Sequence, residues 1–151
     1  MLTLRPYENV DSPAIVNLWY SSWHSNDPLF LHPDPVEKWA ARWEEEIVPH
    51  HDIAVALDGT QVSGFCAIDI AGKYLSQLFV HPGSRGRGAG SALLNWAKAA
   101  CPQGFTLDNL VRNTQSRRFY EVHGLKPGST GLDPRSRLET IEYVWGPAFD
   151  P

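Results

Sequence analysis

The sequence predicts an α+β fold, with a mixed central β-sheet of about seven strands flanked by about four helices. Short runs rich in β-branched and aromatic residues, bounded by turn residues, predict the strands. Segments with apolar residues at three- and four-residue steps predict the helices. The inferred order is one strand, two helices, three strands, a helix, a strand, a helix and two strands. Because the 151 residues contain no linker, repeat or low-complexity segment, we expect residues 1–151 to form a single domain.

The amino-terminal third is expected to form one strand and two helices. The strand ends near Pro6, and Asp11-Ser12-Pro13 then supplies a cap residue followed by a proline at the first helical position. Asp34 and Glu37 have the spacing of a capping box for the second helix, which ends at Pro49. The expected buried faces contain Ile15, Leu18, Trp19, Ser22 and Trp23 in the first helix, and Val36, Trp39, Ala40, Trp43 and Ile47 in the second.

Three strands follow as an antiparallel meander. The hairpin signal Asp58-Gly59 joins Ile53–Leu57 to Val62–Ile70, and a turn at Ala71-Gly72-Lys73 leads into Tyr74–Val80.

The remaining elements are a helix, a strand, a helix and the final strands. A helix from about Gly88 to Ala100 leads to Phe105–Leu110, which should pair in parallel with the last strand of the meander, because strand–helix–strand crossovers are almost always parallel. Asn113 is the expected N-cap of the last helix, and Gly124 ends it. The alternating segment Leu138–Trp145 is a strand, and the expected inward residues of the last helix are Phe119 and Val122.

The composition excludes several classes of protein. The chain has 13 Lys+Arg against 17 Asp+Glu, a formal net charge of −4, and no basic run exceeds two residues, so we expect no nucleic-acid partner. No apolar run approaches the roughly 18 residues of a membrane span, and the amino terminus lacks a signal-peptide pattern, so we expect a cytoplasmic protein without a membrane partner. Cys66 and Cys101 lie in apolar contexts outside any C-x-x-C motif, which predicts reduced, buried thiols.

A glycine-rich loop precedes the third helix and has the chemistry of an anion site. The first N–H groups of a helix have no internal partners, and the helix dipole is positive there. Glycines allow an anion to approach the backbone, and arginines add charge-assisted hydrogen bonds. We therefore expect a phosphate or pyrophosphate cradle formed by Arg85, Gly86, Arg87, Gly88, Ala89, Gly90 and Ser91.

Two common phosphate motifs fit this loop poorly. A Walker loop would need Lys and Ser/Thr where Ala89 and Gly90 stand. The dinucleotide pattern G-x-G-x-x-G fits Gly86 and Gly88 but then meets Ser91. Asp108, about 20 residues on, keeps an NAD(P)-binding enzyme open as an alternative. The pattern that fits fully is Arg-x-x-Gly-x-Gly at Arg85, Gly88 and Gly90.

This pattern resembles motif A of the GCN5-related N-acetyltransferases, the GNAT family. The segment from Asn113 to Leu125, Asn-x5-Phe-Tyr-Glu-x-x-Gly-Leu, resembles the last conserved block of the same family. It departs from that block at Ser116, Val122 and Leu125, where alanine, lysine and phenylalanine are usual. The order of elements also fits along essentially the whole chain, although the amino-terminal third matches only in pattern.

The resemblance implies an acetyl-CoA-dependent acyltransferase that uses no metal. It implies that the third meander strand splays from its neighbour and that the Leu78 amide faces the thioester carbonyl. Tyr120 occupies the position of the general acid that protonates the departing thiolate. Besides the loop residues, the implied cofactor-binding residues are Leu78, Phe79, Val80, Asn113, Phe119 and Tyr120.

The general base and the acceptor stay open. No glutamate lies on Tyr74–Val80, where many relatives have one, so the candidates for the base are His24, Asp69, Tyr74 and Asp108. His50-His51-Asp52 lacks a third ligand at metal-binding spacing, so we read it as a helix end.

The acceptor pocket is expected between the first two helices and the central strands. Its candidate residues are Trp19, Trp23, His24 and Tyr74, with the long loop His24–Pro33 beside them. Aromatic walls with acidic neighbours such as Asp27 favour a small cationic amine with an apolar body, although a peptide acceptor stays open. A non-catalytic acyl-CoA-binding regulatory module is a further alternative, and the sequence leaves a homodimer open.

Overall fold

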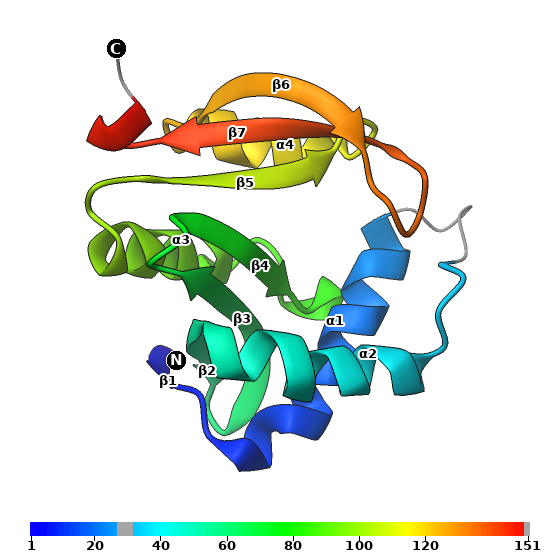
Figure 1. Cartoon of the computed structure of the whole chain (residues 1–151). Coiled ribbons are helices and arrows are strands. Elements are labelled where there is room, and N and C mark those ends of the chain that lie inside the picture. Colours follow the sequence, from blue (N-terminus) through cyan, green and yellow to red (C-terminus); the bar gives the residue numbers. More distant parts are fainter. Residues whose placement is uncertain (27–31, 150–151) are drawn as a thin grey trace.

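The computed structural model describes residues 1–26 and 32–149, and its centre is a seven-stranded mixed sheet in the order β1-β2-β3-β4-β5-β7-β6 (Figure 1). The strands are β1 (Leu2–Pro6), β2 (Asp52–Asp58), β3 (Gln61–Asp69), β4 (Tyr74–Val80), β5 (Phe105–Leu110), β6 (Lys126–Leu132) and β7 (Glu139–Trp145). The helices are α1 (Ser12–Asn26), α2 (Val36–Arg42), α3 (Ala89–Ala100) and α4 (Thr114–Val122), and α2 continues as a π-helical turn, Trp43–Ile47, and a 3-10 turn, Val48–His50. In this part of the chain no helix is long and apolar enough to cross a membrane.

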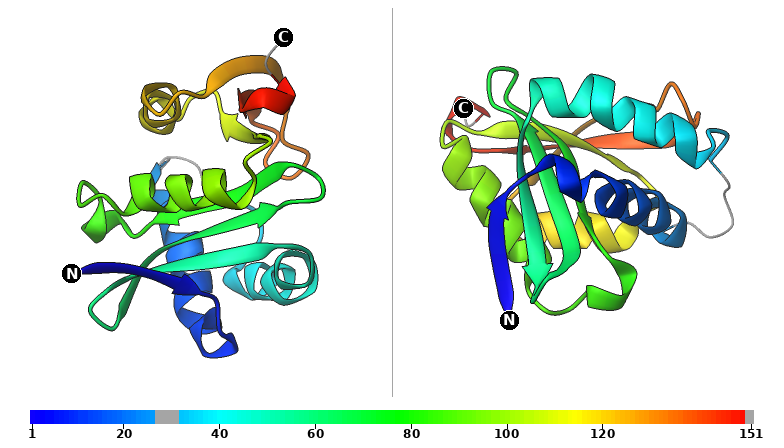
Figure 2. Two further views of the ribbon diagram at one scale, coloured as in Figure 1. Left: turned by 90° about the vertical axis from the view of Figure 1, so that its left-hand side faces the viewer. Right: turned by 90° about the horizontal axis from the view of Figure 1, so that it is seen from below.

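The sheet has a hydrophobic core on each face. Trp19 and Trp43 of the α1–α2 side pack against Phe65 of β3. The opposite core joins Leu93 of α3 and Tyr120 of α4 to the other face of the central strands. This two-sided arrangement confirms the predicted α+β fold, and the right-hand view of Figure 2 shows α1 and α2 on the other side of the central strands from α3. Cys66 and Cys101 are free, buried thiols, as predicted.

The central strands diverge along their length. The parallel pairing of β4 with β5 is confirmed, but its one register pair is Tyr74 with Thr106. The Thr106 amide donates to the Lys73 carbonyl over 2.9 Å at the same end. Beyond that point β5 pairs with β7 along its whole length, while β4 pairs with β3 (Figure 1). The splay that the resemblance implied is therefore present.

A β-bulge in β4 sets which side chains face which core. Ala67 pairs with Gln77 but Ile68 pairs with Leu75, so Ser76 is the extra residue. The bulge lets Leu75 and Leu78, three residues apart, contact the same core. Ser76 is left between them on a strand that borders the widening gap.

Several details of the helices correct the predictions. The predicted capping box of the second helix is wrong, since Pro35 is the N-cap and Asp34 pairs instead with Lys38 at 3.9 Å and Arg135 at 3.8 Å. Val122, predicted to face inward, is 76% exposed because the last turn of α4 faces solvent there. The first helix continues past His24 to Asn26, so the predicted loop His24–Pro33 is partly helical, and residues 27–31 lie outside the described part. The Asn113 cap is confirmed, because its Oδ1 accepts a hydrogen bond from the Ser116 amide over 3.2 Å.

Candidate active site

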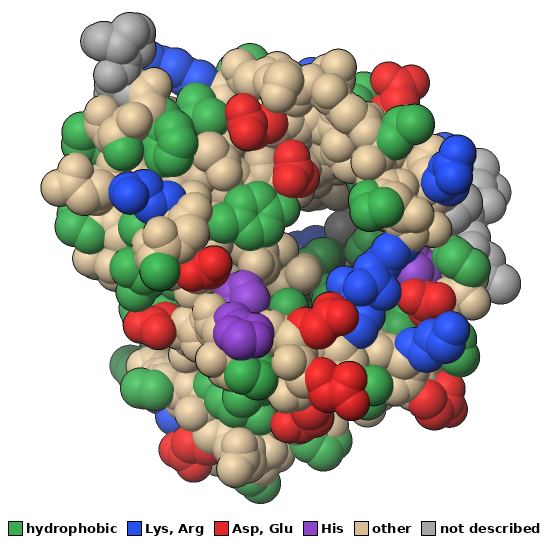
Figure 3. All heavy atoms as spheres, in the orientation of Figure 1, with side chains coloured by type: hydrophobic (Ala, Val, Ile, Leu, Met, Phe, Trp, Pro, Cys, Tyr) green, Lys and Arg blue, Asp and Glu red, His purple; other side chains and the backbone are tan. Residues whose placement is uncertain are grey.

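Two cavities meet where β4 and β5 diverge. The glycine-loop cavity, about 430 Å³, lies between the end of β4, the loop before α3 and α4. The tryptophan cavity, about 240 Å³, lies between α1, α2 and the other side of the strands, and takes its name from Trp19, Trp23 and Trp39. A deep opening near the middle of the molecule is visible in Figure 3. The residues that line both cavities are Leu78, Phe79, Ser116 and Tyr120.

The glycine loop leaves space above the start of α3. Gly86 and Gly88 have φ values of +81° and +89°, in the left-handed region that favours glycine, and Gly88 is the N-cap of α3. A Cβ atom added to either residue would meet nothing within 4 Å, so there is open space beside both glycines, which line the cavity. At Gly90, by contrast, a Cβ atom would lie 3.3 Å from the Phe119 ring. This glycine therefore permits close packing of α3 against α4.

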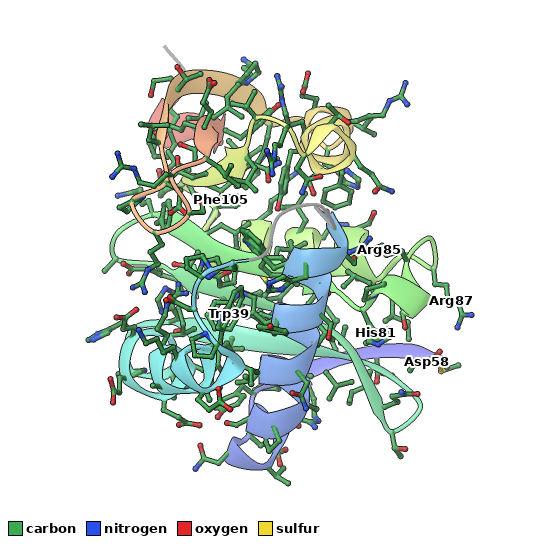
Figure 4. The ribbon with its side chains drawn as sticks, turned by 90° about the vertical axis from the view of Figure 1, so that its right-hand side faces the viewer. Trp39, Asp58, His81, Arg85, Arg87 and Phe105 are labelled. Atoms are coloured by element: carbon green, nitrogen blue, oxygen red, sulfur yellow. The ribbon has the colours of Figure 1, made fainter. Side chains whose placement is uncertain are left out.

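The two arginines of the loop have different positions (Figure 4). Arg85 lines the glycine-loop cavity, and its Nη2 donates to Ser25 Oγ of α1 over 3.1 Å. Arg87 does not line the cavity and lies beside Asp58 on the periphery, with Nη1 and Oδ2 3.4 Å apart. Because both partners are exposed, this pair adds little stability. Among the predicted loop residues, the cavity is lined by Arg85, Gly86, Gly88, Ala89, Gly90 and Ser91.

The end of β4 brings backbone groups to the junction. Leu78, Phe79 and Val80 pair with β3 on one side, and β5 is absent from the other side at this level. Backbone groups of β4 that point toward β5 therefore have no strand partner. One of the carbonyls on this stretch, that of Val80, accepts a hydrogen bond from Ser22 Oγ over 3.0 Å. Every second amide along this stretch of β4 points to the unpaired side, where a ligand can accept its hydrogen bond.

Tyr120 lies at the junction itself. It is on α4, its side chain is 8% exposed, and it packs against Phe119 and Tyr143. Burial raises the pKa of its phenol, so the hydroxyl stays protonated at neutral pH. Within the described part of the chain, this hydroxyl makes no hydrogen bond to another residue. It is a proton donor that faces both cavities. Asn113, which the resemblance implied as a cofactor-binding residue, lines the tryptophan cavity and not the glycine-loop cavity.

The structure separates the predicted candidates for the base. Tyr74 and Asp108 line the tryptophan cavity, where the Tyr74 hydroxyl donates to Asp108 Oδ2 over 2.9 Å. Burial, followed by this hydrogen bond, raises the pKa of Tyr74. Asp69 lies outside both cavities, and its Oδ1 accepts from the Gly72 amide over 3.0 Å in the β3–β4 turn. Asp108 lines the tryptophan cavity and not the glycine-loop cavity, so the structure does not bring it together with the loop as an NAD(P) site would need.

His24 is not placed as a base. Its Nδ1 donates to the Tyr20 carbonyl over 2.7 Å, and its Nε2 accepts from the His32 amide over 3.3 Å. Both ring nitrogens are thus used within the fold, and His24 does not line either cavity. Trp19 and Trp23, predicted with it, do line the tryptophan cavity, with Trp19 in the core and Trp23 half-buried. Asp27 lies outside the described residues.

A hydrogen-bonded serine and histidine were missed by the sequence interpretation. His51 Nδ1 lies 2.7 Å from the Ile47 carbonyl, which can only accept, so this nitrogen carries the proton. Nε2 is then an acceptor, and the Ser76 hydroxyl donates to it over 2.6 Å. Ser76, the bulge residue of β4, lines the tryptophan cavity. No local sequence pattern could indicate this pair, because the two residues are 25 positions apart.

Charged side chains of the tryptophan cavity were missed as well. The cavity is lined by Arg42 of α2 and by Asp133 and Arg135 of the loop before β7. The Arg42 guanidinium lies 5.1 Å from the Trp19 ring centroid and 5.9 Å from that of Trp39. Among the residues described, no group of three or more His, Cys, Asp or Glu side chains is arranged to hold a metal ion.

The fold and the site define a class of protein in which a glycine-loop cavity meets a second cavity where two neighbouring strands, β4 and β5, separate. The family model of the Acetyltransferase (GNAT) family matches residues 13–125, and the chain belongs to this family. Comparison with curated proteins yields no significant match.

Solved structures share the fold over nearly the whole chain. A GCN5-related N-acetyltransferase from Rhodopseudomonas palustris has a TM-score of 0.78 at 17% identity, covering 95% of this chain and 94% of that one. A histone acetyltransferase HPA2 and related acetyltransferase from Corynebacterium glutamicum has a TM-score of 0.78 at 23% identity, with 99% and 98% covered. YncA from Salmonella typhimurium, solved with its cofactor acetyl-CoA, has a TM-score of 0.72 at 16% identity, with 99% and 95% covered.

Proposed function

We propose that this chain is an N-acetyltransferase that transfers the acetyl group of acetyl-CoA to a primary amine of a small molecule or peptide. The amine attacks the thioester carbonyl directly in a ternary complex, a nitrogen–carbon bond forms, and the thiolate of coenzyme A leaves. The observation that carries this proposal is the junction of two cavities at Leu78 and Tyr120. One cavity offers an anion cradle, and the other offers room for a second substrate.

The glycine-loop cavity fits the pyrophosphate of acetyl-CoA. The space above Gly86 and Gly88 is open, the first amides of α3 lie at the positive end of the helix dipole, and Arg85 adds a cation. On a chain of net charge −4, this local arrangement has to provide the attraction for the phosphates. The splayed stretch Leu78–Val80 then leaves amides for the acyl-carrying arm and for the oxygen that becomes negative during attack.

One residue and one hydrogen-bonded pair can serve the proton transfers. Tyr120, buried and protonated, donates to the departing thiolate. On the acceptor side, the oxygen of Ser76 takes a proton from the attacking amine while its own proton passes to His51 Nε2 along the 2.6 Å hydrogen bond. We favour this relay over Tyr74 and Asp108, because a neutral imidazole is the commonest acceptor of protons near neutral pH.

The proposal is tested by binding and by turnover. Acetyl-CoA should raise the melting temperature, and free thiol should appear when it is incubated with a panel of primary amines that includes amino acids, polyamines, aminoglycosides and peptides. Gly88→Asp should abolish the thermal shift, because a carboxylate at the cradle repels the pyrophosphate.

Gly88→Asn is the matched control, since asparagine has the same size and tolerates the same left-handed backbone without the charge. It should retain most of the shift. An unmoved melting temperature at millimolar acetyl-CoA contradicts the proposal, and binding without any release of thiol would favour the non-catalytic module.

A further inference from the structure

The far wall of the tryptophan cavity carries a guanidinium with unused donors. Arg42 is 20% exposed and lies over the Trp19 and Trp39 rings. Its ion contact is with Glu46, where Nε and Oε2 are 3.6 Å apart, too far for a hydrogen bond. Burial, followed by repulsion from Arg135, lowers the pKa of this guanidinium, because the nearby carboxylates only partly compensate for the lost hydration. An anion that entered the cavity would replace the interactions that the guanidinium has lost with water.

Both unsatisfied buried donors of the described chain belong to this cavity. Within residues 1–26 and 32–149, the buried side-chain nitrogens without a hydrogen-bond partner are Arg42 Nε and Asn109 Nδ2. Both residues line the tryptophan cavity, Arg42 from α2 and Asn109 from β5. Buried donors without acceptors are rare in folded proteins, because each one carries a desolvation penalty. Their occurrence in one cavity wall shows that this wall is rich in donors and short of acceptor atoms.

The other charges of the cavity are largely engaged. Arg135 lies 3.8 Å from Asp34 and 3.6 Å from Glu46. Asp133 accepts from the Ser136 amide over 2.8 Å, and Asp108 accepts from Tyr74. Burial lowers the pKa of His32, which favours its neutral form. Arg42 shares Glu46 with Arg135 at the same distance, but it is more buried, 20% against 43% exposed, and within the described residues it has one ion contact against two. It is therefore the less compensated of the two arginines, and it would repel a second ammonium group of a polyamine.

We propose that the acceptor amine also carries a carboxylate, which Arg42 binds, and an apolar body that lies against the tryptophans. An α-amino acid with an aromatic or large aliphatic side chain has this chemistry. A carboxylate offers acceptors only, which matches a wall whose free groups are donors. The inference rests on the proposed function and replaces the expected cationic acceptor, because the described wall presents Arg42 and Arg135 rather than uncompensated acids.

Matched pairs of amines isolate the carboxylate. The pairs are L-phenylalanine with phenethylamine, L-tryptophan with tryptamine and L-leucine with isoamylamine, and the members of each pair differ only by the carboxylate. For the best pair, kcat/KM of the acid should exceed that of the amine by about tenfold to a hundredfold, the range of one charge-assisted hydrogen bond. The amide L-phenylalaninamide should behave like phenethylamine.

Variants of α2 test the role of Arg42. Arg42→Gln should bring kcat/KM of the acid down to that of the amine, with KM for acetyl-CoA unchanged. Arg42→Lys keeps the charge and should keep part of the preference, although it loses the fork of the guanidinium. Lys38→Gln removes a charge from the same helix at an exposed site outside the cavity and should keep the full preference.

Each outcome decides the inference. Equal kcat/KM for acid and amine in the wild-type enzyme overturns it, as does an equal loss for both in Arg42→Gln. Should Arg42→Gln fail to fold, the comparison of Arg42→Lys with the wild type decides. No transfer to any of these pairs also overturns the inference, whereas the proposed function fails only if no amine of the wider panel releases thiol.

Discussion

At the scale of single residues, Tyr120 is the group whose surroundings suit one role most closely. A tyrosine in the core normally bonds its hydroxyl to a neighbour. Tyr143, which is also buried, donates to Glu121 over 2.7 Å and accepts from Arg117 over 3.2 Å. Tyr120 has no such bond within the described chain and borders both cavities. The contrast supports the proposed role of the Tyr120 hydroxyl as a donor to a ligand.

Tyr120→Phe should therefore lower turnover by about 10²-fold, the lower end of general-acid contributions, and leave KM for acetyl-CoA nearly unchanged. The measurement is steady-state release of free thiol at saturating acceptor. Tyr143→Phe is the control, because it also removes a buried hydroxyl but at a site away from the cavities. It should keep turnover and cost about 1 kcal/mol of stability per lost hydrogen bond. An unchanged turnover number in Tyr120→Phe removes this residue from the mechanism.

The residues that the sequence could indicate are those that lie within one motif. Gly86, Gly88 and Gly90 share a loop whose spacing alone predicts an open cradle. Arg42, Ser76 and His51 carry no such signal, because their partners are brought to them by packing between distant segments. Arg87 shows the opposite error. Its place in the glycine loop predicts a contact with a bound anion, but its side chain points outward to Asp58.

At the scale of elements, the bulge of β4 places the hydroxyl of Ser76 in the wall of the tryptophan cavity. Ser76 is the extra residue, so its side chain is set off from the regular alternation of the strand and reaches His51. The histidine is held in turn by the Ile47 carbonyl, at the end of the helical segment that follows α2. Hydrogen bonds therefore connect β4, through His51, to the π-helical turn Trp43–Ile47, and they hold the Ser76 hydroxyl in place beside the cavity.

Ser76→Ala and His51→Gln should each lower kcat by about 10²-fold with KM for both substrates nearly unchanged, since each removes one member of the relay. Ser76→Thr keeps a hydroxyl on a strand that favours β-branched residues and should recover much of the rate. Rates from single-turnover and steady-state assays separate a loss in chemistry from a loss in binding. If Ser76→Thr is as impaired as Ser76→Ala, or if KM alone changes, the pair has a structural role.

The elements that the sequence predicted well have strong periodicity or clear boundaries. The bounds of β4 and β5 are as predicted, and α4 has the predicted N-cap, because Asn113 and Gly124 mark its ends chemically. The strand order required a further strand before β7, yet Lys126–Leu132 contains a proline and two glycines and is exposed throughout. Such an edge strand has no alternating pattern, and it forms only because β7 offers it a partner.

At the scale of the whole molecule, the sheet acts as a wall that opens at one place. β4 and β5 meet at Tyr74 and then separate, so a ligand on the α3–α4 side and a ligand on the α1–α2 side can touch. The splay could be predicted only from the family resemblance, because the spacing between strands is a property of the assembled sheet and leaves no pattern in the sequence. The two hydrophobic cores lie on either side of the opening and hold its edges.

In the tryptophan cavity, one aromatic wall residue, Trp19, belongs to the hydrophobic core, and another, Trp23, is only half-buried. Trp19 is 2% exposed and contacts Trp39, Trp43 and Phe65, whereas Trp23, one turn further along α1, is half-buried. Trp19→Ala should therefore destabilise the protein by about 3–5 kcal/mol, the cost of a large core cavity. Trp23→Ala should cost clearly less, because a half-buried ring loses less buried area.

The functional effects of the two substitutions should differ in the same way. Trp23→Ala should give a folded enzyme with a raised KM for the acceptor and an unchanged KM for acetyl-CoA, because Trp23 lines only the tryptophan cavity. Trp96→Ala is the matched control, since it removes a half-buried indole from α3 that lines neither cavity, and it should leave both KM values unchanged. Denaturant unfolding and steady-state kinetics on the three variants provide the measurements. If Trp23→Ala unfolds as readily as Trp19→Ala, the indole is a core residue, and the acceptor wall must be sought at Arg42 and Asn109 alone.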